Sequence, residues 1–136
     1  MLGIITSMSS KKPIQILFIE DDPDSQALAR KIFMYHGLSF VTASTAQEAL
    51  QYCDVYEPQL IVTDLSLPDM QAENWISILR QREDLKKVPI LVVSASSIQV
   101  LNKEQVLAFG ANDFLLKPYR VDELVQNIKK YLKIPN

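Results

Sequence analysis

The chain has 136 residues, 48% of them hydrophobic and 22% charged, which is the size and composition of one globular domain. A net charge of -2 with both signs interspersed gives no polybasic face for nucleic acid, and no apolar run approaches the roughly 20 residues that span a bilayer. Cys53 is the only cysteine, which excludes an internal disulfide and predicts a small buried side chain in a reducing, cytoplasmic compartment.

The first elements are a tail, a strand and a helix. We expect residues 1–11 to form a flexible tail without signal-peptide character, followed by a domain over residues 12–133. Residues 14–19 are a near-continuous apolar run, which is typical of a strand buried on both faces. A helix is predicted from the N-cap Asp22, with proline directly after it, to Gly37. Its apolar residues recur at helical spacing: Leu28, Ile32 and Tyr35.

The middle of the chain repeats this alternation. Residues 39–42 form a short strand pattern, and a second helix is predicted from Thr45, with Glu48 at the spacing of a capping box. Residues 60–62 are a second apolar strand pattern, and a third helix is predicted over residues 71–82. Three of its residues are expected to face inward: Trp75, Ile76 and Leu79.

The last third adds two more strand and helix pairs. Strands are predicted at residues 90–93 and 113–116, and a fourth helix lies between residues 98 and 109 and stops at Gly110. A fifth helix follows Pro118 and has an apolar stripe: Val121, Leu124, Val125, Ile128, Tyr131 and Leu132. Five strands alternating with five helices predict an α/β fold, a doubly wound parallel sheet with helices on both faces.

Polar residues follow the predicted strands, at the edge where doubly wound sheets place their function. Glu20 and Asp21 follow the first strand, Asp64 the third, Ser94 the fourth and Lys117 the fifth. Crowded carboxylates repel one another, and a divalent cation such as Mg²⁺ relieves that repulsion. An aspartate can then attack a phosphoryl donor, while the lysine and the serine stabilise the charge that develops on the phosphoryl oxygens.

Ordinary structural roles compete with this interpretation. Asp22 is better explained as a helix cap than as a site residue, because Pro23 follows it. Lys117 could be a lysine that extends its charge to solvent, and Ser94 alone would look the same in a turn. His36 lies beside the end of the first helix, where an imidazolium is favourable, and we expect no phosphotransfer role for it.

Four motifs in order resemble the response-regulator receiver domain, the phosphoacceptor of two-component signalling. They are ILFIEDD (16–22), LIVTDLSLPDM (60–70), PILVVSA (89–95) and GANDFLLKP (110–118), within a resemblance that covers residues 12–132. Each motif alone is weak, but their combined order and spacing are specific. The resemblance implies a CheY-like, flavodoxin-like fold with five strands in the order 2-1-3-4-5.

The resemblance also implies the phosphorylation site and its metal ligands. Asp64 would be the phosphorylated aspartate, with Mg²⁺ or Mn²⁺ as cofactor. Asp21 would bind the metal directly and Glu20 mainly through water, and the backbone carbonyl of Ser66 would be a further ligand. The chain would undergo phosphorylation and autodephosphorylation without being a classical enzyme.

The switch residues follow from the same resemblance. Ser94 would move toward the phosphoryl group, Lys117 would hold a phosphate oxygen, and Pro118 would follow in a cis peptide. Phe114 would swing inward as the switch aromatic, although it lacks the hydroxyl that many members carry. Ala72 stands where the family usually has glycine, which would cost stability or change the geometry if the position needs a positive φ.

The implied partners are a sensor histidine kinase or a histidine phosphotransfer protein, and an unknown downstream protein. Phosphorylation would change the surface of the fourth helix, fifth strand and fifth helix, through which a phosphorylation-dependent dimer could also form. We expect a stand-alone regulator without direct nucleic-acid or membrane binding, and a receiver cut from a longer protein stays an alternative.

Three rival functions compete with the receiver interpretation. A phosphatase of the haloacid-dehalogenase type would need an Asp-x-Asp motif, which neither Asp21 nor Asp64 begins. A receiver that works unphosphorylated, as an interaction module, is disfavoured by the complete set of site residues. A flavodoxin-like redox carrier would need a hydroxyl-rich phosphate loop after the first strand.

Overall fold

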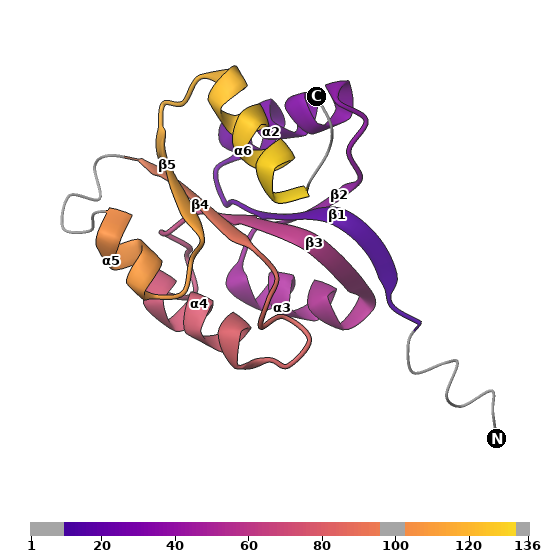
Figure 1. The fold of residues 1–136 in the computed structure, drawn as a ribbon, viewed down its shortest axis with the longest axis vertical. Coiled ribbons are helices and arrows are strands. Elements are labelled where there is room, and N and C mark those ends of the chain that lie inside the picture. The colour runs from indigo at the N-terminus through magenta and orange to yellow at the C-terminus, as the bar shows by residue number, and fades with distance from the viewer. Residues whose placement is uncertain (1–9, 96–102, 133–136) are drawn as a thin grey trace.

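The computed structural model describes residues 10–95 and 103–132, which form a single parallel sheet between two layers of helices (Figure 1). The strands are β1 (Lys12–Ile19), β2 (Phe40–Ala43), β3 (Tyr56–Thr63), β4 (Ile90–Ala95) and β5 (Asp113–Lys117). The helices are α2 (Pro23–Tyr35), α3 (Ala46–Val55), α4 (Ala72–Gln81), α5 (Lys103–Ala108) and α6 (Val121–Leu132). Helices α2 and α6 cover one face, and α3, α4 and α5 cover the other.

The order of the strands is β2-β1-β3-β4-β5, and every neighbouring pair is parallel. The predicted doubly wound fold with the order 2-1-3-4-5 is therefore confirmed. Strand β3 begins earlier than its apolar run indicates, because Tyr56 pairs with Lys12 of β1. The exposed Glu57 and Gln59 interrupt the hydrophobic pattern in the first half of β3, so the apolar run predicts only the second half of the strand.

The sheet divides the interior into two cores. Along β1, Leu17 and Ile19 pack toward α3 and α4, while Ile16 and Phe18 pack toward α2 and α6. This alternation follows from the two-residue period of a strand, and burial on both faces explains why β1 reads as a continuous apolar run. Cys53 is buried in the first core, as predicted.

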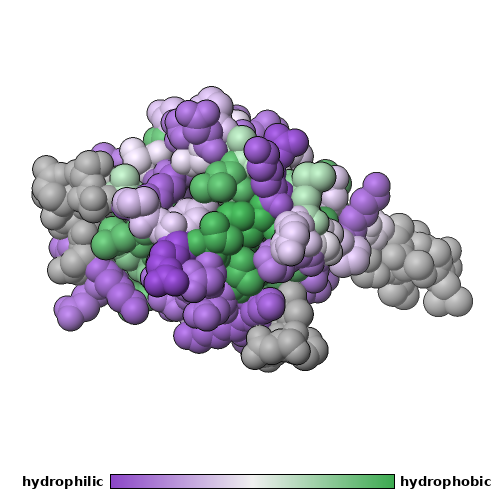
Figure 2. Space-filling view, turned by 90° about the horizontal axis from the view of Figure 1, so that it is seen from above, coloured by the Kyte–Doolittle hydropathy of each residue, from purple (hydrophilic) through white to green (hydrophobic). Residues whose placement is uncertain are grey.

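The buried face of α2 differs from the predicted one. Leu28 is 47% exposed and Tyr35 is 87% exposed, whereas Ile32 is buried as expected. The rotation of the helix is set by Phe33, whose ring packs edge-on against Phe18 at a centroid distance of 5.5 Å. In α6, Val121 of the predicted stripe is likewise 49% exposed. Seen from the side of α2 and α6, apolar side chains gather in the middle of the face with hydrophilic residues around them (Figure 2).

The helix caps are those that the sequence predicts. Asp22 accepts a hydrogen bond from the Ser25 N–H at 2.9 Å, and Thr45 accepts one from the Glu48 N–H at 3.0 Å. Gly37 ends α2 at a positive φ of 68°, which glycine adopts without strain. The start of the predicted fourth helix lies outside the described residues. No described helix is both long and apolar enough to cross a membrane.

Candidate functional site

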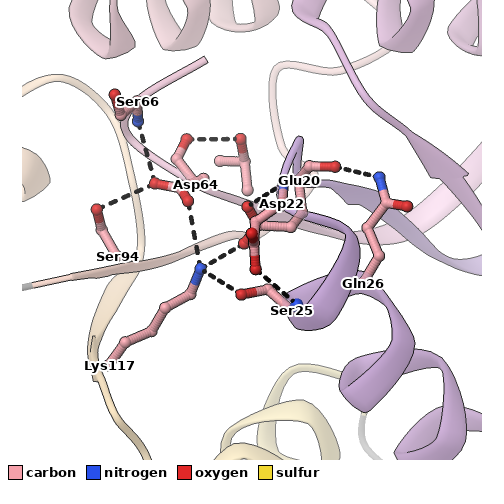
Figure 3. A network of polar contacts seen from close by, with 9 residues as sticks. Glu20, Asp22, Ser25, Gln26, Asp64, Ser66, Ser94 and Lys117 are labelled. Atoms are coloured by element: carbon pink, nitrogen blue, oxygen red, sulfur yellow. Dashed lines mark hydrogen bonds and ion pairs between the residues drawn. The ribbon is translucent and has the colours of Figure 1, made fainter. Parts of the chain in front are cut away.

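Side chains from four strand ends meet at one edge of the sheet (Figure 3). Glu20 follows β1, Asp64 follows β3, Ser94 lies near the end of β4, and Lys117 ends β5. Because these four strands are parallel and adjacent, their carboxyl ends lie side by side, which brings together residues up to 97 positions apart in the sequence. The predicted grouping of these four residues is present in the structure.

Asp64 is the centre of this network. Its Oδ1 accepts hydrogen bonds from the Ser94 hydroxyl and from the Ser66 N–H, both at 3.0 Å, and its Oδ2 lies 3.3 Å from the Lys117 ammonium nitrogen. The Asp64 side chain is only 11% exposed. Each oxygen of this carboxylate therefore faces a donor that can also stabilise negative charge added at the same place.

Lys117 bridges two carboxylates. Its Nζ is hydrogen-bonded to Glu20 Oε1, and it lies 3.3 Å from both Asp64 Oδ2 and Ser25 Oγ. Burial by itself would lower the pKa of Lys117, but the hydrogen bond to Glu20 and the charge of Asp64 outweigh burial and raise it. Lys117 is therefore a fixed cation of the site and not a side chain extended into solvent.

Glu20 is almost fully buried, with a relative exposure of 2%. This burial raises the pKa of Glu20, while the hydrogen bonds from Lys117 and from the Asp22 N–H oppose the change. Gln26 of α2 holds the main chain here, because its amide donates to the Glu20 carbonyl oxygen and, at 3.1 Å, to Ser44 Oγ. Glu20 is thus a buried carboxylate whose negative charge is paired with the Lys117 ammonium group.

The acidic group fits a divalent metal ion. Glu20, Asp21 and Asp64 each offer a carboxylate oxygen, and these oxygens lie within 4.8 Å of one another. Asp21 is exposed while Glu20 is buried, so a bound ion would be reached from solvent on the Asp21 side. Hard cations such as Mg²⁺ prefer this kind of oxygen set, completed by water. The metal role of the Ser66 carbonyl stays a prediction.

The predicted switch residues lie next to this group. Ser94 is fully buried, and Phe114 is half-buried against the core that contains Trp75. The Lys117–Pro118 peptide is cis, as the resemblance implied. Ala72 is the first helical residue of α4, so this position does not use the left-handed backbone that glycine would favour. His36 caps the C-terminal end of α2, as predicted.

Two further anchors of the site were not predicted. Ser25 reaches Lys117, but in the sequence it is one polar residue of a helix start. Asp69, in the loop after Asp64, accepts hydrogen bonds from the N–H groups of Ala46 at 2.9 Å and Gln47 at 3.0 Å, and so fastens this loop to the start of α3. Neither contact leaves a local sequence signal, because each joins segments distant along the chain.

The family model of the response regulator receiver domain matches residues 16–129. The transcriptional regulatory protein TrcR of Mycobacterium tuberculosis is 31% identical over 122 residues, which are 89% of this chain and 46% of TrcR. An uncharacterised 14.6 kDa protein of Leptolyngbya boryana is 28% identical over 91% of this chain and 94% of its own length. The chain thus spans about half the length of TrcR and nearly all of the Leptolyngbya protein.

A solved structure agrees with these sequence matches. The crystal structure of a candidate response regulator from Chloroflexus aurantiacus J-10-fl superimposes with a TM-score of 0.81 at 29% identity. The superposition covers 90% of this chain and all of that one. The structural likeness therefore extends over most of the chain, and the residues that the family model matches include all four strand ends that carry the site.

Proposed function

The chain belongs to the response regulator receiver family, and from this premise we propose that it is a phosphoacceptor whose aspartate is Asp64. The observation that carries the proposal is the convergence of Asp64 with a hydroxyl, an ammonium group and two further carboxylates at one sheet edge. The family is a signalling family and not a classical enzyme family, which fits a protein in which the Asp64 side chain is itself modified.

The donor is a phosphohistidine on a sensor kinase or a phosphotransfer protein. A carboxylate oxygen of Asp64 attacks the phosphorus, an O–P bond forms, and the P–N bond to the imidazole breaks. The electron pair of the broken bond returns to the imidazole nitrogen, which takes up a proton. The product is an acyl phosphate on Asp64, and the reaction consumes no other reagent.

The residues around Asp64 have separate tasks in this transfer. Lys117 lies 3.3 Å from Oδ2 and stabilises charge on a phosphoryl oxygen, and the Ser94 hydroxyl, 3.0 Å from Oδ1, donates a hydrogen bond to another. Glu20 and Asp21, with Asp64, would hold the divalent ion. A bound Mg²⁺ or Mn²⁺ would neutralise the approaching phosphoryl oxygens as a Lewis acid.

The transfer changes the charge that Ser94 and Lys117 experience. Phosphorylation makes the Asp64 side chain more negative, to about -1.5 to -2. The hydroxyl that now donates to Asp64 Oδ1 then has phosphoryl oxygens as better acceptors, and Lys117 has a stronger partner than Glu20. Phe114 pairs with Val92 across the β4–β5 pair, and Val92 precedes Ser94 by two residues on the same face of β4. A movement of Ser94 toward the phosphoryl group therefore gives the half-buried ring room to turn inward.

The output follows from where these residues lie. Phe114 and Lys117 both belong to β5, so the surface of α5, β5 and α6 is the one that changes and recruits a downstream protein or a second copy of the chain. We propose a cytoplasmic regulator that acts by protein contact, with no direct nucleic-acid or membrane binding. Recognition without phosphorylation is the second candidate function, and it predicts equal partner binding by both forms.

The test is labelling of the purified chain with acetyl phosphate and Mg²⁺. The wild type is expected to form an acid-stable, base-labile acyl phosphate, and Asp64→Asn is expected to form none. Asp54→Asn is the matched control, because Asp54 is a carboxylate with 70% side-chain exposure on α3. Undiminished labelling of Asp64→Asn would contradict the assignment of the phosphorylated residue.

A further inference from the structure

A buried chain of two hydrogen bonds leads from α4 to the backbone of Asp64. Trp75, the only tryptophan, is fully buried, and its indole N–H donates to Thr63 Oγ1 at 3.1 Å. Thr63 is also fully buried and precedes Asp64 in the sequence. Its hydroxyl donates to the carbonyl oxygen of Asp64 at 2.9 Å. Neither side chain belongs to the group of residues that surrounds the Asp64 carboxylate.

The direction of this chain is fixed by chemistry. An indole N–H can only donate, so the Thr63 oxygen accepts from Trp75. The single hydroxyl proton of Thr63 is then directed to the Asp64 carbonyl. Trp75 therefore orients the threonine hydroxyl, and the threonine holds the backbone of the phosphoacceptor.

With the Thr63 hydroxyl, both backbone polar groups of Asp64 have a hydrogen-bond partner. The N–H of Asp64 donates to the Ile19 carbonyl at 3.0 Å, and its C=O accepts from Thr63. The peptide plane between Asp64 and Leu65 is the first of the loop that carries Ser66, whose N–H donates to Asp64 Oδ1 at 3.0 Å (Figure 3). A rotation of that plane would displace Ser66 relative to the carboxylate.

We infer that Thr63, oriented by Trp75, is a positioning residue that sets the Asp64 carboxylate and the Ser66 backbone for phosphoryl transfer. The inference rests on the proposed function. It extends that function from the residues around the phosphoryl group to a buried pair that acts only through the main chain. Small displacements of reacting groups cost rate more than they cost stability, which makes this role separable from packing.

Thr63→Val tests the role of the hydroxyl, because valine has nearly the same shape as threonine. The measurements are the limiting rate of labelling by acetyl phosphate and the Mg²⁺ concentration that gives half of this rate. Loss of one hydrogen bond is expected to slow labelling roughly three- to tenfold at saturating Mg²⁺. Thr63→Ser keeps the hydroxyl and is expected to label within about twofold of the wild type.

A second pair of variants separates rate from stability. Thr63→Val leaves the indole N–H of Trp75 buried without an acceptor, which destabilises the fold. In a Trp75→Phe background no such N–H exists, so Thr63→Val should cost less stability in urea unfolding. The Asp64 carbonyl loses its donor in both backgrounds, so Thr63→Val should slow labelling in both, but by less in the Trp75→Phe background, where the indole no longer orients the threonine hydroxyl.

The outcomes distinguish the two proposals. If Thr63→Val labels at the wild-type rate, or Thr63→Ser is slowed as much as Thr63→Val, the positioning role is wrong while Asp64 remains the phosphoacceptor. If Trp75→Phe alone labels at the wild-type rate and Thr63→Val causes no slowing in that background, the slowing in the wild-type background is a packing effect only and the inference is overturned. If the wild type itself takes no label, the proposed function fails, and the inference fails with it.

Discussion

Replacing Lys117 by methionine removes the cation that joins Glu20 to Asp64 and keeps a long apolar side chain. The lysine side chain is 20% exposed, and its two carboxylate partners are 3% and 11% exposed. After the substitution both carboxylates stay in place without a described cationic partner. We therefore expect the metal-free protein to lose stability and a divalent ion to restore it.

The size of the loss follows from the geometry. A charge pair at 3.3 Å, the Lys117–Asp64 separation, is worth about 5 kcal/mol at an effective dielectric constant of about 20. Desolvation of the ions offsets much of this, and breaking a buried pair typically costs about 3–5 kcal/mol. Burial already raises the pKa of Glu20, so proton uptake limits the loss at low pH. A group whose pKa is raised in the folded state loses stabilising free energy as the pH rises. The free energy of unfolding of Lys117→Met, relative to that of the wild type, should therefore be lower at pH 8 than at pH 5.

The assay is urea unfolding of wild type and Lys117→Met at pH 8, with EDTA and with Mg²⁺. Without metal, the variant should unfold about 3 kcal/mol more easily. Saturating Mg²⁺ stabilises whichever form binds it, and it should stabilise the variant more, because in the wild type it competes with Lys117 for Glu20. In a Glu20→Gln background the same lysine substitution should cost clearly less.

Lys130→Met is the matched control. Lys130 is 65% exposed on α6, and its Nζ lies 3.7 Å from Asp113 Oδ2, so its loss should cost under about 1 kcal/mol. The reasoning is refuted if Lys117→Met is no more destabilising than Lys130→Met without metal. It is equally refuted if the cost of Lys117→Met is unchanged when Glu20 is glutamine.

Two further predictions concern residues outside the site. The hydrogen bond from Arg82, together with one from Lys11, lowers the pKa of Asp84 from 3.8 to about 2. The ionised Asp84 therefore stabilises the fold above pH 4, and this contribution is lost as the pH falls toward 2. Asp84 is 39% exposed, so Asp84→Asn should cost under about 1 kcal/mol at pH 6, and its unfolding free energy should converge with that of the wild type near pH 2; a constant difference would contradict this. Gly110→Ala should cost about 1–3 kcal/mol in urea unfolding, because φ is 119° and the new Cβ would lie 3.0 Å from Arg80 Cγ. Gly37→Ala, at φ 68° with open space around it, should cost less, and equal losses would contradict the role of the Arg80 contact.

Much of the fold could be predicted because its signals are local. Apolar runs marked the strands that are buried on both faces, and the caps at Asp22 and Thr45 marked where helices begin. The strand order came from the resemblance of the motifs, since periodicity alone does not say which strands are neighbours. Helix rotation was predicted less well: Leu28 and Tyr35 fit the helical spacing, yet the ring packing of Phe33 turned both toward solvent.

The candidate site divides in the same way. The sequence by itself determined which residues follow the strands, and in a parallel sheet that suffices to bring Glu20, Asp64 and Lys117 to one edge. Only the tertiary structure decided that Ser25 reaches Lys117, that Asp69 fastens its loop to α3, and that Trp75 orients Thr63. The physical reason is that the end of a strand can be recognised from local sequence, and parallel strands bring their carboxyl ends to one edge of the sheet. A hydrogen bond between a helix and a strand, or between a loop and a helix, depends instead on how those elements pack in the tertiary structure.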